Sequence, residues 1–151
     1  MSGIFAVALA AHVLIGLIGV MASYATLMGL LRREPPLLFL RFSALTAFLS
    51  YLLSWVSGGY YYVLRYGIEV KPVILVGAYP WAHTVIMESK EHIFLFLPVL
   101  AFTVLLVLWR QGDRIASDQG LKRALIYLAA LTAFLGIFIA IAGVVISGAA
   151  K

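Results

Sequence analysis

The stretch that decides the fold is Pro80–Arg110, PWAHTVIMESKEHIFLFLPVLAFTVLLVLWR. Its first thirteen residues hold five ionisable side chains, namely His83, Glu88, Lys90, Glu91 and His92. The remainder is an almost unbroken apolar run that ends at Trp109 and Arg110. Because a helix crosses the hydrocarbon core of a bilayer with ~20 apolar residues, this pattern predicts a membrane-spanning helix that begins in a polar segment.

The composition of the whole chain agrees with a membrane protein. Hydrophobic residues make up 64% and charged residues only 11%, with a mean hydropathy of +1.08, whereas soluble domains carry about 25% charged residues. No cysteine is present, which excludes thiolate metal sites, iron–sulfur ligation and thioether-linked haem. The net charge of +5 comes from basic residues scattered in short loops beside apolar spans, so a nucleic-acid partner is not predicted.

Three further apolar stretches predict an all-α, integral membrane four-helix bundle in which residues 1–151 form a single transmembrane domain. Pro35 and Pro36 separate the first two spans, because proline ends one helix and readily opens the next. Ser117 or Asp118 is expected to cap the last span. The spans are expected at about 4–31, at 37–57 with an extension to 65 left open, at 90–110 within a helix that begins near 80, and at 121–147.

The lysine and arginine residues predict the orientation of these spans. The first and third connections carry seven of them: Arg32, Arg33, Arg41, Arg110, Arg114, Lys122 and Arg123. The other side carries four: Arg65, Lys71, Lys90 and Lys151. Since cytoplasmic loops are enriched in these residues, we expect an up-down-up-down bundle with both termini outside, in a bacterial or archaeal inner (cytoplasmic) membrane.

The connection between the second and third spans, roughly residues 66–79, is expected to be a long outer loop punctuated by glycine and proline. Aromatic residues surround it: Tyr60, Tyr61, Tyr62, Tyr66, Tyr79 and Trp81. Tyrosine and tryptophan favour the headgroup level of a bilayer, so these side chains are interpreted as an interfacial belt. The alternative is a lid over a site.

Three spans carry rows of small or weakly polar residues at helical spacing, which places each row on one face of its helix. Such faces pack tightly against other helices in lipid. The alternative is that they make room for a planar cofactor or a quinone headgroup. The rows are Ala8, His12, Gly16, Gly19 and Ser23; Ser43, Ala47, Ser50, Ser54 and Ser57; and Ala129, Thr132, Gly136, Ala140, Gly143 and Ser147.

Two histidines are expected at the same depth. His12 precedes Arg32 by twenty residues and His92 precedes Arg110 by eighteen, so both lie ~27–30 Å from the cytoplasmic surface. Two histidines at matched depth on different helices are suited to be the axial ligands of one haem b. As an alternative, His12, Glu88 and His92 would hold a single transition-metal ion. His83 is a less suitable ligand, because it is expected outside the hydrocarbon near Trp81.

Other residues of the opening stretch suggest proton chemistry. Glu88 and His92 are four residues apart and share a helix face, and Glu91 lies on the neighbouring one. Glu88 or Glu91 is therefore a candidate to orient a ligand ring or to accept a proton from a quinol. Pro98 removes the helical partner of the Phe94 carbonyl group, so a kink is expected there.

In architecture alone, the predicted bundle resembles four-helix membrane cytochromes of b type, which carry haem between their helices. This resemblance implies a membrane-embedded electron-transfer module or subunit with haem near the outer face, exchanging electrons with quinone. It would contact the lipid bilayer and other membrane or periplasmic subunits, or form a homo-oligomer. The rival hypotheses are a non-catalytic structural or assembly subunit without a cofactor, and a His/Glu metal or proton transport element.

Overall fold

A computed structural model describes residues 3–150 of the chain, and this range contains helices but no strand. Four helical stretches are long and apolar enough to cross a membrane, namely Gly3–Leu30, Leu37–Val76, Ala82–Arg114 and Gln119–Ala149. The predicted all-α class with four apolar spans is therefore confirmed. The elements are α1 (Gly3–Leu30), α2 (Leu37–Tyr61), η1 (Tyr62–Val70), α3 (Lys71–Val76), η2 (Ala82–Met87), α4 (Glu88–Phe94), α5 (Phe96–Gln111), η3 (Gly112–Arg114) and α6 (Gln119–Ala149).

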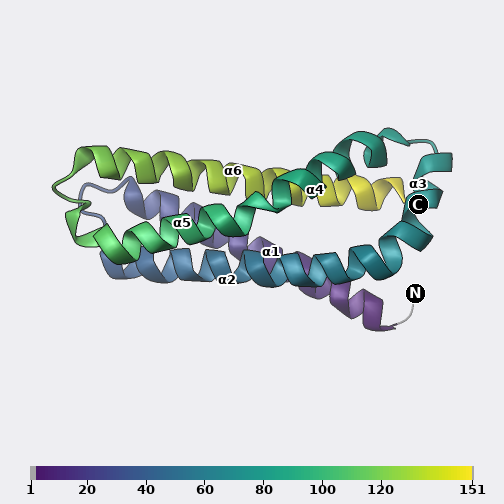
Figure 1. The fold of residues 1–151 in the computed structure, drawn as a ribbon, viewed down its shortest axis with the longest axis horizontal. Coiled ribbons are helices and arrows are strands. Elements are labelled where there is room, and N and C mark those ends of the chain that lie inside the picture. The colour runs from purple at the N-terminus through teal and green to yellow at the C-terminus, as the bar shows by residue number, and fades with distance from the viewer. Residues whose placement is uncertain (1–2, 151) are drawn as a thin grey trace.

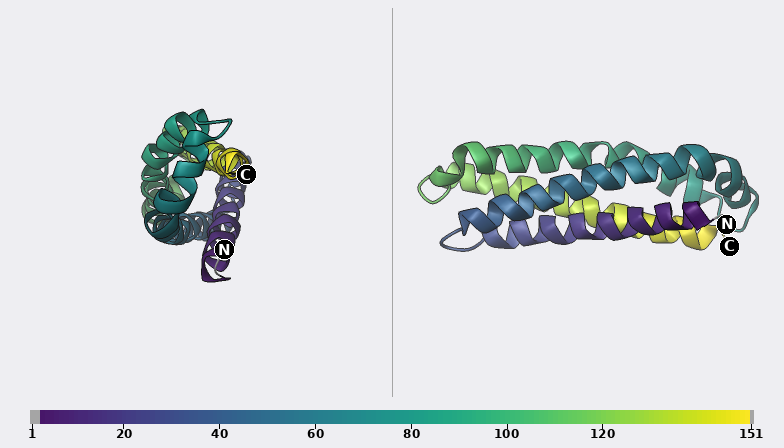
Figure 2. Two further views of the ribbon diagram at one scale, coloured as in Figure 1. Left: turned by 90° about the vertical axis from the view of Figure 1, so that its right-hand side faces the viewer. Right: turned by 90° about the horizontal axis from the view of Figure 1, so that it is seen from below.

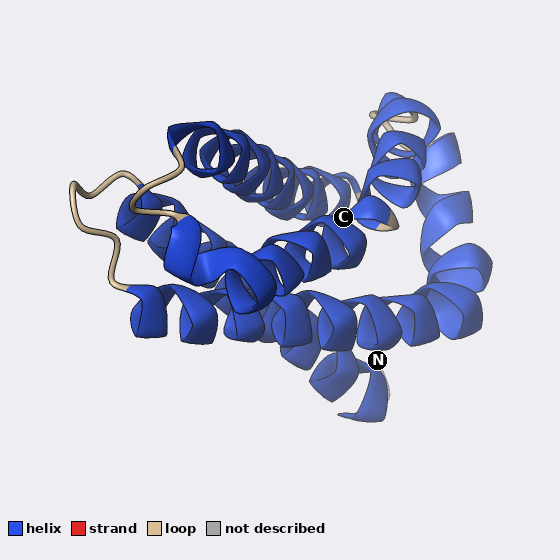
Figure 3. Cartoon of the chain, turned by 60° about the vertical axis from the view of Figure 1, so that its left-hand side comes forward, coloured by secondary structure: helices blue, strands red, loops and turns tan. Residues whose placement is uncertain are grey.

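The long helices lie side by side, with α1 packed against α2 and α6, and α5 packed against α2 and α6. Both chain ends lie at the same end of this assembly (Figures 1 and 2). We call it the polar end, because His12, His83 and residues 88–92 lie there. Loops are confined to short connections between helices (Figure 3).

Local signals in the sequence explain where several helices begin and end. Pro36 directly precedes α2, a position where its missing N–H costs nothing. The Asp118 carboxylate accepts a hydrogen bond from the backbone N–H of Leu121 at 2.9 Å, which confirms a cap at the start of α6. The third span is interrupted at Leu95, between α4 and α5, as expected from the missing N–H of Pro98.

The connection predicted as a loop over residues 66–79 is instead helical as far as Val76. Pro72 lies in the first turn of α3, where proline is tolerated. Tyr66 of η1 and Ile74 of α3 are buried together with Ala82 and Ile146. Burial of these large side chains stabilises helix in a segment whose glycine and proline content suggested a loop.

Small residues pack the middle of the bundle, as the rows in the sequence predicted. Gly19 and Gly136 both approach the Tyr51 ring so closely that an added Cβ would collide with it. The buried members of the three rows are Gly19, Ser23, Ser43, Ala47, Ser50, Ser54, Ala129, Thr132 and Gly136. In α6 the row does not continue as predicted, because Ser147 is exposed and Ala142 and Ile146 are buried in its place.

At the end opposite the polar end, the helices meet in a purely apolar cluster. Leu30 ends α1, Leu40 lies in the first turn of α2, and both are fully buried. They pack with Leu108 and Leu125, near the cytoplasmic-side connection of the predicted topology. We call this set the leucine seal, consisting of Leu30, Leu40, Leu108 and Leu125.

Candidate functional site

His12 of α1 is held against α2 by hydrogen bonds. Its Nδ1 lies 2.8 Å from the carbonyl oxygen of Ser54 and 3.1 Å from the Ser54 hydroxyl oxygen. The same hydroxyl group donates to the carbonyl oxygen of His12 at 3.2 Å. With Nδ1–H directed at a carbonyl group, the second ring nitrogen, Nε2, is left to act as the acceptor or ligand.

Gly58 makes room for the imidazole ring. A Cβ at this position would lie 2.6 Å from both Cε1 and Nδ1 of His12. A residue with a side chain is therefore incompatible with the observed ring position. Gly58 was not among the predicted site residues, although its spacing of four residues from Ser54 was a signal that could have found it.

Lys90 is a second residue near His12 that was not among the predicted site residues, although it was named among the ionisable side chains of the opening stretch. Its ammonium group lies near enough to His12 for their charges to interact. It also reaches α6, where a Cβ on Gly143 would lie 3.6 Å from Nζ. Lys90 therefore extends along the bundle side of α4 rather than into open solvent.

Glu91, which follows Lys90 in α4, has a buried carboxylate oxygen. Its Oε1 is shielded from solvent and has no hydrogen-bond partner among residues 3–150. Tyr62 and Lys90 are both near enough to interact electrostatically with this carboxyl group. We call His12, Tyr62, Lys90 and Glu91 the inner cluster.

Glu88 and His92 share a face, as predicted, but it is the face turned away from the bundle. Both are exposed and border an open groove of about 490 Å³ with Thr84 and Ser89. The Nδ1 of His92 bonds the Glu88 carbonyl oxygen at 2.7 Å. Since residues two apart on a helix are separated by about 200°, His92 points opposite to Lys90. The structure thus does not bring His92 toward His12, and their pairing stays a prediction.

The metal hypothesis also stays a prediction. Within residues 3–150, no three histidine or acidic side chains are gathered as a metal ion would require. His12 contacts α2, whereas Glu88 and His92 border the open groove. A metal ion bound at either place would need ligands from elsewhere.

His83 lies in a different environment from the one predicted. It was expected at an aqueous rim near Trp81, but it is only 3% exposed. Its Nδ1 is hydrogen-bonded to the Tyr66 hydroxyl group at 3.0 Å. The reason is that η2 packs onto α6 and α3, which covers His83 instead of leaving it at the surface.

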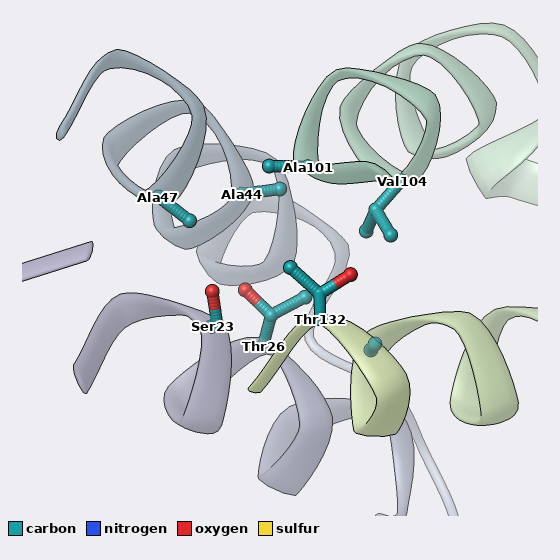
Figure 4. A pocket seen from close by; sticks show the side chains of 8 residues that line it. Ser23, Thr26, Ala44, Ala47, Ala101, Val104 and Thr132 are labelled. Atoms are coloured by element: carbon teal, nitrogen blue, oxygen red, sulfur yellow. The ribbon is translucent and has the colours of Figure 1, made fainter. Parts of the chain in front are cut away.

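The middle of the bundle holds a small cavity, lined mostly by alanine and by the side chains of serine and threonine. Side chains from α1, α2, α5 and α6 point toward it (Figure 4). Its volume of about 10 Å³ is the size of one water molecule, so the small residues here pack helices rather than house a planar cofactor. Its lining residues are Ser23, Thr26, Ala44, Ala47, Ala101, Val104, Ala129 and Thr132.

The chemistry of the described residues is thus concentrated at the polar end. The inner cluster combines a histidine with a free ring nitrogen, a lysine and a carboxylate with an unpaired oxygen. The lysine donates hydrogen bonds, and the carboxylate can accept a proton. Comparisons with protein families, with curated proteins and with solved structures found no match.

Proposed function

We propose that this chain is an integral membrane subunit that binds the headgroup of a quinone at the polar end and exchanges protons with it. The observation that carries this proposal is the unpaired Oε1 of Glu91, buried beside Lys90 and Tyr62. A buried carboxylate oxygen without a donor is costly unless a ligand supplies one. The hydroxyl group of a quinol is such a donor.

The other members of the inner cluster suit the carbonyl oxygens of the oxidised headgroup. The Lys90 ammonium group is a donor of hydrogen bonds, and Nε2 of His12 becomes one when the ring is protonated. The number of residues from His12 to the end of α1 is similar to the number from Lys90 to the end of α5. Both side chains therefore lie near one level of the proposed membrane span. Intramembrane ionisable groups turned toward a bundle commonly mark ligand and proton pathways.

Oxidation of a quinol releases two protons and two electrons. In this proposal, Oε1 of Glu91 accepts a proton from the quinol hydroxyl group as its O–H bond breaks. The electrons pass to a haem or another one-electron carrier, on this chain or on a partner subunit. The chain is accordingly an electron-transfer subunit rather than a stand-alone enzyme.

Haem b binding remains a second candidate function, favoured by the hydrogen bond between His12 and Ser54. Axial histidines donate their other ring N–H to a carbonyl oxygen in this way, which fixes the ring and directs Nε2 at the iron. His92 bonds the Glu88 carbonyl oxygen through the same nitrogen. Because His92 faces outward, a haem held by this pair requires either a rotation of α4 or a second protein chain.

We also propose the predicted membrane topology, with the spans alternating in direction, both termini outside and the leucine seal toward the cytoplasm. The excess of lysine and arginine on the two short connections supports it. The surrounding bilayer is the medium for the many large apolar side chains that the helices expose. Other membrane or periplasmic subunits, or further copies of this chain, would complete the electron-transfer path.

Calorimetric titration of the purified protein in lipid nanodiscs with short-chain ubiquinone and menaquinone analogues tests the proposal. We expect saturable binding that weakens by about tenfold or more in Glu91→Gln and Lys90→Met. Glu88→Gln is the matched control, because it alters a carboxylate of the same helix that is exposed and borders the open groove. No binding of either analogue, or equal loss in Glu88→Gln and Glu91→Gln, would contradict the proposal. A Soret band in the same sample that disappears in His12→Ala would support the haem candidate instead.

A further inference from the structure

We infer that the end of the bundle opposite the polar end binds the phosphate headgroups of anionic phospholipids. We call it the basic end. The two short connections between spans lie there (Figure 1), and residues 32–41 and 110–123 carry seven basic side chains against three acidic ones. The inference does not depend on the proposed quinone site, which lies at the other end of the helices. The basic end consists of Arg32, Arg33, Arg41, Arg110, Arg114, Lys122 and Arg123.

Arg41 and Lys122 hold neighbouring helices together at the basic end. Nε of Arg41 donates to the carbonyl oxygen of Leu108 at 3.1 Å, which joins α2 to the last turn of α5. Nζ of Lys122 donates to the carbonyl oxygen of Arg32 at 2.7 Å, which joins the start of α6 to the residues that follow α1. Because Arg32 and Lys122 belong to different connections, these contacts bring the basic residues of both connections onto one surface.

The five other basic residues are exposed arginines that form no ion pair among residues 3–150. The acidic residues nearby have other partners or none. Asp113 lies 3.8 Å from Arg41, and the Asp118 carboxylate accepts a hydrogen bond from the backbone N–H of Leu121. A group of uncompensated positive charges beside membrane spans attracts anionic headgroups. The five exposed arginines are Arg32, Arg33, Arg110, Arg114 and Arg123.

The kind of basic residue also points to phosphate. Six of the seven arginines in the chain belong to the basic end, but only one of its four lysines does. The remaining arginine, Arg65, is ion-paired with Glu69 and lies over the ring of Phe5. A guanidinium group forms two parallel hydrogen bonds with a phosphate group, which an ammonium group cannot do in the same geometry. Free arginines are therefore concentrated where phospholipid headgroups would lie.

Large exposed apolar or aromatic side chains accompany three of these arginines. Each lies directly before its arginine or one helical turn toward the middle of the bundle, and each is more than half exposed. Tryptophan and tyrosine favour the headgroup level of a bilayer, and leucine favours its acyl chains. The guanidinium groups are thus placed at the level of the lipid phosphates, with apolar surface for the chains beside them. The pairs are Leu31 with Arg32, Trp109 with Arg110, and Tyr127 with Arg123.

Electron paramagnetic resonance of spin-labelled lipids tests the inference. The protein is reconstituted in phosphatidylcholine vesicles with a trace of spin-labelled phosphatidylglycerol or spin-labelled phosphatidylcholine, and the motionally restricted fraction of each label is compared. We expect phosphatidylglycerol to be preferred by about threefold or more at low salt, because each basic residue at a membrane surface adds to the attraction. The preference should fall at high salt, since exposed charges are screened. Both leaflets hold the same lipids, so the result is independent of the direction of insertion.

Glutamine variants locate the binding surface. Replacement of all five exposed arginines by glutamine should remove most of the preference for phosphatidylglycerol. Arg110→Gln alone should lower it measurably, because it removes one free guanidinium group beside Trp109. Lys71→Gln is the matched control, since it removes the same charge from α3, which packs at the other end of the bundle. All of these side chains lie outside the buried core, so the variants are expected to unfold at the wild-type temperature.

The outcomes separate this inference from the proposed function. Equal restriction of the two lipids by the wild type overturns the inference, and so does a preference that survives replacement of all five arginines. An equal loss in Arg110→Gln and Lys71→Gln also overturns it, because net charge would then act without a particular surface. A preference for phosphatidylglycerol in a protein that binds no quinone analogue supports the inference and rejects the quinone site alone.

Discussion

The imidazole ring of His12 and the backbone of Ser54 are joined across two helices by a hydrogen bond of 2.8 Å. This contact exists only because Gly58, one turn further along α2, has no side chain where the ring lies. The first two helices of the chain thus fix one ring nitrogen and leave the other available. The position of this ring depends on a glycine as much as on the histidine.

Gly58→Ala is therefore expected to displace the His12 ring. The added Cβ would lie 2.6 Å from two ring atoms, and overpacking of this kind costs about 1–3 kcal/mol. We expect a lower unfolding temperature in detergent and weaker binding of quinone analogues, similar to that of His12→Ala. Gly59→Ala is the control, because a Cβ at Gly59 meets nothing within 4 Å. Equal stability and affinity in Gly58→Ala and wild type would show that the ring position is not required.

Gly136→Ala is expected to destabilise the middle of the bundle. The new methyl group would collide with the Tyr51 hydroxyl group and lie 3.1 Å from a methyl carbon of Val20. We expect a loss of about 1–3 kcal/mol in the free energy of unfolding. Gly148→Ala, where a Cβ meets nothing within 4 Å, should be neutral. A double variant with Tyr51→Phe should recover part of the loss, and failure to recover any would place the clash elsewhere.

Removal of the Tyr51 hydroxyl group alone has a separate expected cost. The Ser23 hydroxyl group donates to it at 3.0 Å in a buried setting. Tyr51→Phe leaves this donor to find another partner, and the typical cost is about 1 kcal/mol. Chemical denaturation in mixed micelles measures the difference. A companion Ser23→Ala change should then add less to Tyr51→Phe than it costs by itself, and full additivity would argue against the hydrogen bond.

Asp118→Ala is expected to weaken the start of α6. The lost hydrogen bond to the Leu121 N–H, 2.9 Å long, corresponds to about 1 kcal/mol. Asp118→Asn should retain most of the stability, because asparagine is an equally good cap. Thermal unfolding followed by circular dichroism distinguishes the two variants, and equal losses in both would indicate that the carboxylate charge matters rather than the cap.

The proposed topology is testable by thiol labelling, since the chain has no cysteine of its own. Val76→Cys and Asp113→Cys introduce single thiols at positions that are 87% and 85% exposed. In intact cells, a membrane-impermeant maleimide should label the first and not the second. The reverse pattern would invert the orientation and place the inner cluster on the cytoplasmic side.

The sequence was sufficient to predict the spans, because long apolar runs specify membrane helices by length alone. Span one was expected from residue 4 and span two from residue 37, and helices α1 and α2 begin at Gly3 and Leu37. The helical nature of residues 66–76 was not predicted, because it depends on burial of Tyr66 and Ile74 against distant α6. Local glycine and proline signals carried no information about that contact.

The rotation of each helix about its axis was the harder part of the site to predict. A spacing of four residues correctly placed Glu88 and His92 on one face, but a span that is apolar all round does not reveal which face meets the bundle. His92 therefore was paired with His12 on depth alone, whereas Lys90 is the neighbour that the structure places near His12. The predicted haem pair has still to be tested by spectroscopy.

The leucine seal has a consequence for energy conversion. It closes the bundle with Leu30, Leu40, Leu108 and Leu125, and the 10 Å³ cavity above it holds no ionisable group. Neither the leucine seal nor the lining of this cavity includes an ionisable side chain, so under the proposed function protons released at the polar end would stay in that compartment. If the electrons leave toward the opposite side through a partner, each turnover separates charge. Under the proposed function, the subunit would then contribute to a transmembrane potential.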